Sequence, residues 1–185
     1  MEGEINMFLT KYAGDYKLDE NDPKGRKTVY CGKYYSIDEN TEDRKLRIIF
    51  LWCFTLVATI AFILSLSFPN SLARLFFVVV PFSFNALTLY SAWASVIKYS
   101  FNKKERLERK EKEEMLDRMK SASLVGFIIC LFSFGASIVA AALKLFSFGS
   151  LEIGFLTGLV LVLVSFFGVN ALSRAIKVNE VENTI

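Results

Sequence analysis

The sequence of 185 residues contains no histidine, and only three cysteines and three prolines. Without histidine, the chain lacks the side chain that most often serves as a general base and as a metal ligand. The cysteines, Cys31, Cys53 and Cys130, lie far apart, which argues against a disulfide framework or a clustered metal site. A glycine-rich phosphate loop is also missing. We therefore expect no enzymatic activity, no cofactor and no metal.

Charged residues are nearly missing from two long blocks of the chain. Residues 48–97 contain one, Arg74, and residues 121–173 contain two, Lys144 and Glu152. The chain is 53% hydrophobic and has 18 phenylalanines, and its mean hydropathy is +0.37. Water-soluble cores are not built from such blocks, so the composition indicates an integral membrane protein.

Each of these blocks divides into two apolar runs that are long enough to cross a lipid bilayer. The first run has 21 residues. As a helix it would be about 31 Å long, which matches a hydrocarbon core of about 30 Å. The four runs are residues 48–68, 72–97, 121–143 and 151–172. Because the connection within each block is short, we predict an all-α integral membrane protein with four transmembrane helices, arranged as two antiparallel hairpins over residues 48–97 and 121–172.

Lysine and arginine are distributed unevenly along the chain. Of the 22 in total, nine precede the first predicted span, nine lie between the second and third spans, and two follow the fourth. Cytoplasmic loops of membrane proteins carry an excess of these residues. The distribution therefore predicts that both termini and the central connection are cytoplasmic, with the spans in the cell membrane.

The central connection, residues 98–120, is rich in charges of both signs. Asn102 followed by Glu105 resembles a capping box, which predicts a helix that begins at Lys103 and runs into the third span. Acid-base pairs four residues apart would support such a helix in water. The mixture of signs argues against nucleic-acid binding. We interpret this segment as a charged cytosolic helix that binds a protein partner. Its candidate contact residues are Lys103, Lys104, Arg106, Arg109 and Lys112.

The amino-terminal region, residues 1–47, is predicted to be cytosolic. An apolar stripe predicts an amphipathic helix over residues 4–13, which would dock on the protein or on the lipid interface, or would bind a partner. Residues 28–37 are consistent with a small β-hairpin that needs a surface to lean on. Its tyrosines, Tyr30, Tyr34 and Tyr35, fit either membrane-interface anchors or an exposed contact patch. The cytosolic tail comprises residues 173–185, and its polar last part, residues 178–185, is expected to be frayed.

Small and polar residues follow one face of three predicted spans, at a spacing that favours helix packing in lipid. Pro81 is also expected to bend the second span by releasing the carbonyl of Phe77. These faces would either pack against one another or line a path for a solute. The candidate residues are Pro81, Asn85, Thr88, Ser133, Ser137, Gly154 and Gly158.

No acidic or basic residue lies at the middle of a predicted span, whereas ion-coupled transporters normally keep one there. We therefore expect a non-enzymatic accessory subunit or scaffold, which binds a protein partner or further copies of itself through its cytosolic segments. The alternative is a small homo-oligomeric channel or carrier for a small solute, with a polar path lined by Asn85, Thr88 and Ser133.

Overall fold

The computed structural model describes residues 12–18, 28–67, 70–146 and 149–181. Four of its helical stretches are long and apolar enough to cross a membrane, namely Thr41–Ser67, Phe76–Phe101, Arg109–Ala142 and Ser150–Arg174. The prediction of a mostly helical protein with four candidate spans is confirmed. In chain order the elements are η1 (Ala13–Asp15), β1 (Tyr16–Leu18), β2 (Thr28–Tyr30), β3 (Tyr34–Ile37), α2 (Thr41–Ser67), η2 (Leu72–Arg74), α3 (Phe76–Ser83), α4 (Asn85–Phe101), α5 (Arg109–Lys112), the π-helical turn η3 (Glu113–Asp117), α6 (Arg118–Ala142), α7 (Ser150–Arg174) and β4 (Val178–Val181).

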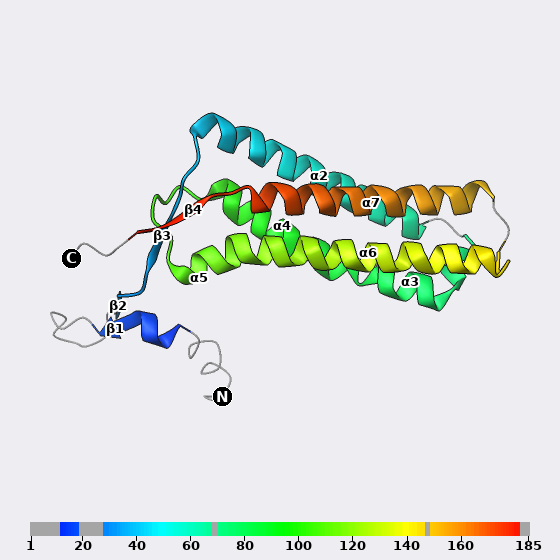
Figure 1. Ribbon diagram of the computed structural model, residues 1–185, viewed down its shortest axis with the longest axis horizontal. Helices are drawn as coiled ribbons and strands as arrows, with labels where there is room; N and C mark the ends of the chain where they lie inside the picture. The colour runs from blue at the N-terminus through cyan, green and yellow to red at the C-terminus, as the bar shows by residue number, and fades with distance from the viewer. Residues whose placement is uncertain (1–11, 19–27, 68–69, 147–148, 182–185) are drawn as a thin grey trace.

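The four spans lie side by side in one bundle (Figure 1). Helix α2 lies against α7 and α4, and α6 lies against α7, α3 and α4, so that each span contacts two others. The strands and α5 gather at one end of this bundle, and the α6 to α7 connection lies at the other end. We call the first of these the charged end, formed by the described parts of residues 12–47, 98–120 and 173–181.

The outer surface of the bundle is apolar along all four spans. Large side chains that point outward include Leu56, Leu87, Phe132 and Val164, each at least 50% exposed. Such a surface suits contact with lipid acyl chains, and the helices satisfy their own backbone groups in that environment. The four apolar helices therefore indicate an integral membrane protein.

Pro81, which is expected to bend the second span, lies inside α3, and the span is interrupted three residues later. Helix α3 ends at Ser83, Phe84 forms a turn, and α4 begins at Asn85. The Asn85 side-chain amide donates to the Phe82 carbonyl at 3.0 Å, and the Phe84 N–H donates to the Pro81 carbonyl at 3.1 Å. These bonds satisfy backbone carbonyls at a point where the regular helical pattern is broken by proline.

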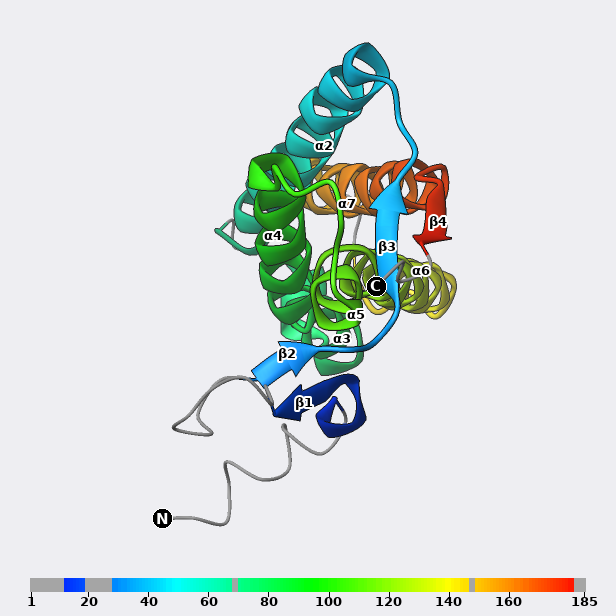
Figure 2. The same ribbon diagram turned by 90° about the vertical axis from the view of Figure 1, so that its left-hand side faces the viewer.

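The predicted hairpin over residues 28–37 does not form. Strand β2 pairs with β1, while β3 pairs with β4, so that Tyr34 lies opposite Val181 and Ile37 lies opposite Val178. Figure 2, which looks at the charged end, shows β3 beside β4. An isolated hairpin is marginal in water, and β3 instead gains a partner strand and an apolar surface beneath it. The tail consequently forms a strand over Val178–Val181 where a frayed end was expected, and the protein is not purely helical. Residues 182–185 of the expected frayed end lie outside the described residues. Most of the predicted helix over residues 4–13 lies outside the described residues.

The predicted helix start at Lys103 is also wrong. Residues 102–108 are not helical, and α5 begins at Arg109. The capping box is formed by Glu108 and Glu111, with the Glu108 N–H donating to Glu111 Oε2 at 3.3 Å. Asn102 instead accepts a bond from the Lys104 N–H, an arrangement that competes with helix formation. The helix then continues through η3 into α6.

The two connections at the opposite end of the bundle are joined by one carboxylate. Glu152 in the first turn of α7 accepts from the Gly149 N–H at 3.1 Å and from the Ser71 N–H at 2.9 Å. Glu152 thus satisfies a free amide at the start of its own helix and fixes the connection that precedes η2.

Candidate functional site

The segment 102–108 at the charged end is rigidly placed although it is not helical. Leu107 is 2% exposed. Its backbone N–H donates to the Tyr35 carbonyl at 2.7 Å, and its carbonyl accepts from the Tyr35 N–H at 2.9 Å. Leu107 and Tyr35 therefore form one antiparallel pair on the free side of β3, and this pairing fixes the position of the segment.

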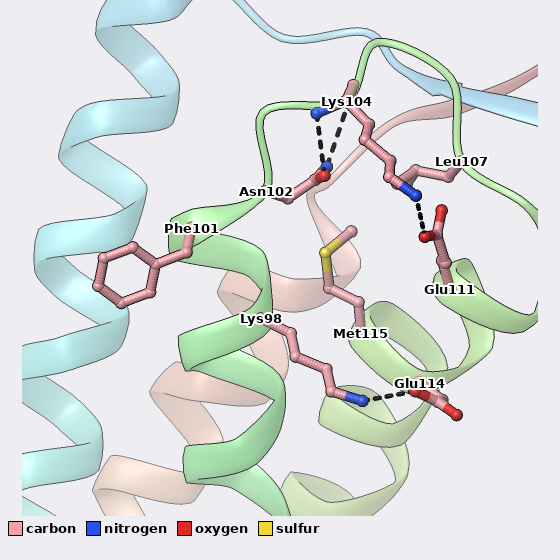
Figure 3. A pocket seen from close by; sticks show the side chains of 8 residues that line it. All are labelled: Lys98, Phe101, Asn102, Lys104, Leu107, Glu111, Glu114 and Met115. Carbon is pink, nitrogen blue, oxygen red and sulfur yellow. Dashed lines mark hydrogen bonds and ion pairs between the residues drawn. The ribbon is translucent and has the colours of Figure 1, made fainter.

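A pocket of about 280 Å³ opens between this segment, the last turns of α4 and the start of the third span. Figure 3 shows two ion pairs at its edge, Lys98 with Glu114 and Lys104 with Glu111. Met115, 3% exposed, and Leu107 give it an apolar floor. The pocket can therefore accept an apolar side chain beside polar and charged groups.

The five predicted contact residues lie around this pocket or close to it, and they differ in whether they already interact with other side chains of the protein. Lys104 pairs with Glu111, and the hydrogen bond from that carboxylate raises the pKa of Lys104. Two others are engaged as well, Arg109 with Glu113 at 3.2 Å and Lys112 over the Tyr35 ring at 4.6 Å from its centroid.

Lys103 and Arg106 differ from these three residues. Both are exposed, and neither forms an ion pair with any other residue of the described ranges. They are the two predicted contact residues whose charge stays available on this surface.

Tyrosines of the amino-terminal region bind the charged segment. The Tyr16 hydroxyl donates to Glu108 Oε2 and the Tyr12 hydroxyl donates to Glu113 Oε2, and the Tyr30 hydroxyl accepts from the Arg109 N–H at 3.0 Å. The bond to the Glu108 carboxylate, with partial burial, raises the pKa of Tyr16. These two regions, which the sequence analysis treated as separate surfaces, thus bind each other.

A buried ionic cluster joins three spans at the charged end. The Glu39 side chain is 4% exposed, and its carboxylate lies 2.9 Å from Arg47 Nε and accepts from the Tyr99 hydroxyl. Arg47 also donates to the Leu172 carbonyl of α7 at 2.9 Å. Arg44 lies over the Tyr99 ring and donates to the carbonyls of Tyr99 and Asn102. We call Glu39, Arg47 and Tyr99 the Glu39 cluster.

Polar residues predicted within the membrane lie on the inner faces of their helices. Asn85 and Ser133 are fully buried, and Thr88 and Ser137 are 8% and 2% exposed. The Thr88 hydroxyl donates to the Asn85 carbonyl at 3.0 Å, and the Ser137 hydroxyl to the Ser133 carbonyl at 2.8 Å. The Ser133 hydroxyl is buried and has no hydrogen-bond partner among the described residues.

The two glycines of the predicted G-x-x-x-G motif have different surroundings. A Cβ atom at Gly158 would collide with Ser65 Oγ and would lie 3.2 Å from the Ala61 carbonyl oxygen of α2. A Cβ atom at Gly154 would meet nothing within 4 Å. Gly158 therefore permits the close approach of α2 and α7, whereas Gly154 is exposed on the outer surface.

No group of three potential metal-binding side chains occurs within the described part of the chain. Comparison with protein-family models, with curated proteins and with solved structures finds no match. The function must therefore be argued from the geometry of the charged end and of the bundle.

Two parts of this site carry no local signal in the sequence. Glu39 lies in an acidic run before the first span, and Tyr99 lies 60 residues later, so no spacing relates them. The tyrosine contacts with the charged segment likewise join residues about 80 to 100 positions apart. Only composition points to these two sets of contacts, because tyrosines and carboxylates are concentrated in the segments next to the spans.

Proposed function

We propose that this chain is a non-enzymatic accessory subunit or scaffold of a membrane assembly, and that its charged end binds a partner protein. The observation that carries the proposal is an ordered surface with two exposed basic side chains that form no ion pair within the described residues. Lys103 and Arg106 stand on segment 102–108, beside a pocket with an apolar floor. An acidic partner segment with one apolar side chain would complement such a surface in both charge and shape.

The intramolecular contacts of the charged end support this proposal. Leu107 is held by β3, and Lys104 and Arg109 are held by neighbouring carboxylates. A surface whose backbone is already ordered loses little conformational entropy on binding, so more of the contact energy becomes affinity. A solvated helix that projects freely from the membrane would not have this advantage.

Photo-crosslinking in native membranes tests the proposal. A crosslinking residue at Arg106 should capture a defined protein, while one at Lys45, an exposed cation of the same end on α2, should not capture it. In detergent pull-downs, the Lys103→Gln/Arg106→Gln variant should recover about tenfold less of that protein, as a loss of about 1.4 kcal/mol implies. A Lys45→Gln/Lys177→Gln variant is the matched control. Equal capture at both crosslinking positions would count against the proposal.

We further propose that the spans insert as two hairpins with the charged end in the cytoplasm. The support is the positive-inside rule, because 20 of the 22 Lys and Arg residues belong to the charged end or its flanking segments. In a variant without native cysteines, a Cys at Lys144 should react with an impermeant maleimide added to intact cells, whereas one restored at Cys31 should react only after lysis. The reverse pattern would overturn this orientation.

A small channel or carrier is the second candidate, and one observation favours it. A buried hydroxyl without a partner is unfavourable within a membrane, and Ser133 of α6 carries one within the described part of the chain, while Asn85 is buried on α4. Because these residues are buried within one chain, the path would run through a single bundle. Solute flux into liposomes that is present with the wild type and lost with Asn85→Leu would support this candidate.

A further inference from the structure

A groove of about 320 Å³ lies between α4 and α6 on the outer surface of the bundle. It is distinct from the pocket beside segment 102–108, since the two share no lining residue. Its walls come from Leu87, Thr88 and Ser91 on one helix and from Arg118, Ser121 and Val125 on the other, with Ala122 between them. The groove is open along its length, so it faces the surroundings of the bundle.

The chemistry of the groove changes along its length. Helix α6 starts at Arg118 at the charged end, so Ser121 lies about 4.5 Å and Val125 about 10.5 Å further into the bundle. Helix α4 runs in the opposite direction, which places Leu87 about 6 Å deeper than Ser91. Arg118 and the hydroxyls of Ser121 and Ser91 therefore lie nearer the charged end. The exposed apolar side chains of Leu87 and Val125 lie deeper, beside Thr88. This is the order of headgroup and acyl chain in a phospholipid.

The charge of Arg118 is not neutralised by an ion pair within the described residues. The two nearest carboxylates along its helix each pair with a lysine, Asp117 with Lys112 at 3.8 Å and Glu114 with Lys98. The charge of Arg118 also acts on the Glu114 carboxylate, but without a direct ion pair. The Ser121 hydroxyl donates to the Arg118 carbonyl, so its oxygen can still accept, while the guanidinium keeps its donors available. A guanidinium without a direct ion pair, at the boundary between polar and apolar surface, favours a group with net negative charge.

We propose that this groove binds one anionic phospholipid, with its phosphate at Arg118 and an acyl chain along Leu87 and Val125. The bidentate donors of the guanidinium suit a phosphate group. The apolar part of the groove, which lies further from the charged end, suits a hydrocarbon chain. The groove opens sideways, so a lipid can enter it from the bilayer without any opening of the bundle. This site is independent of the partner surface, because neither Lys103 nor Arg106 lines it.

The test is native mass spectrometry of the full chain released from nanodiscs made of equal amounts of phosphatidylglycerol and phosphatidylcholine. The wild type should retain phosphatidylglycerol in preference to phosphatidylcholine. Arg118→Gln should lower that retention about fivefold, the effect of one cation at a membrane surface. Arg174→Gln is the matched control, because Arg174 is an exposed arginine at the charged end of α7 and does not line the groove. It should leave retention unchanged.

A second variant separates a shaped site from simple attraction between charges. Ser91→Phe fills the groove and keeps Arg118, so it should also reduce the retained phosphatidylglycerol. The proposal is overturned if Arg118→Gln and Arg174→Gln behave alike, if Ser91→Phe retains as much lipid as the wild type, or if the wild type shows no preference for the anionic lipid. It is equally overturned if the groove variants alter only the proportion of a lipid-free dimer, since a second copy would then be the occupant.

Discussion

Glu39→Ala should be among the most destabilising single substitutions at the charged end. The Glu39 side chain is 4% exposed and accepts from Tyr99 of α4, while it pairs with Arg47 of α2. Arg47 in turn bonds to the Leu172 carbonyl of α7. Removing the carboxylate leaves a nearly buried cation without its counter-charge and a buried hydroxyl without its acceptor.

The size of the effect follows from this burial. Removing one partner of a buried ion pair costs about 3 to 5 kcal/mol in free energy of unfolding. We expect the lower end, about 3 kcal/mol, because the Arg47 side chain is 17% exposed and keeps its bond to the Leu172 carbonyl. Tyr99→Phe removes only a hydroxyl and leaves the ion pair intact, so about 1 kcal/mol is expected.

The chain offers two controls for this prediction. Lys33, which precedes β3, and Glu180 of β4 form an ion pair whose side chains are 72% and 47% exposed. Glu180→Ala should therefore cost less than about 1 kcal/mol. The double variant Glu39→Met/Arg47→Met replaces both charges with apolar groups, so its stability should lie close to that of the wild type or above it.

Unfolding in mixed micelles with increasing SDS measures these differences. The rings of Trp52 on α2 and Trp93 on α4 lie 5.0 Å apart, so tryptophan fluorescence reports on the separation of the two helices. If Glu39→Ala costs no more than Glu180→Ala, the Glu39 cluster does not stabilise this end of the bundle and our reasoning is wrong.

Three further predictions follow from other contacts. Gly158→Ala should separate α2 from α7 and lower the unfolding midpoint, whereas Gly154→Ala, one turn away on the same helix, should raise it slightly, since alanine favours helix and meets nothing there. The folded state raises the pKa of Tyr16, so its bond to Glu108 is fully present below about pH 10 and is lost as the pH rises through the raised pKa. Amide exchange in β1 and β2 should therefore become faster as the pH rises through that pKa. In Tyr16→Phe, exchange should already be faster at neutral pH and should show no further increase of this kind. Leu107 is 2% exposed, so Leu107→Ala should lower the free energy of unfolding by about 2 to 4 kcal/mol and increase amide exchange across segment 102–108. Unchanged exchange would show that burial of Leu107 does not fix this segment.

The membrane part of the fold could be predicted because its signal is local. Runs of apolar residues long enough to cross a bilayer have few stable alternatives to the helix, since every backbone group must be satisfied within the segment. A bend at Pro81 is an equally local prediction, because proline removes one donor and its ring clashes with the carbonyl four residues earlier, but the span is interrupted at Phe84. The inner faces at Asn85, Thr88, Ser133 and Ser137 could be predicted from periodicity alone.

The charged end could not be predicted in the same way. Residues 28–37 contain a plausible hairpin, but β3 pairs with β4, whose residues lie more than 140 positions later. Asn102 and Glu105 have the spacing of a capping box, but the competing turn at Asn102 and the bonds between Leu107 and Tyr35 delay the helix to Arg109. Short polar segments have several local conformations of similar free energy, so tertiary contacts select among them.

The sequence by itself thus determined that this protein has four apolar helices long enough to cross a membrane, and which polar residues share a face on them. It did not determine where the helices begin, since α2 starts at Thr41 and not at residue 48. Only the tertiary structure decided that the amino-terminal tyrosines bind the charged segment, that Gly158 and not Gly154 lies at a helix contact, and that Glu39 pairs within reach of Tyr99. The physical reason is the distance along the chain over which each interaction acts. Burial of a helix in lipid is decided within about 20 residues, whereas an ion pair or a strand pair depends on where the whole bundle brings its ends together.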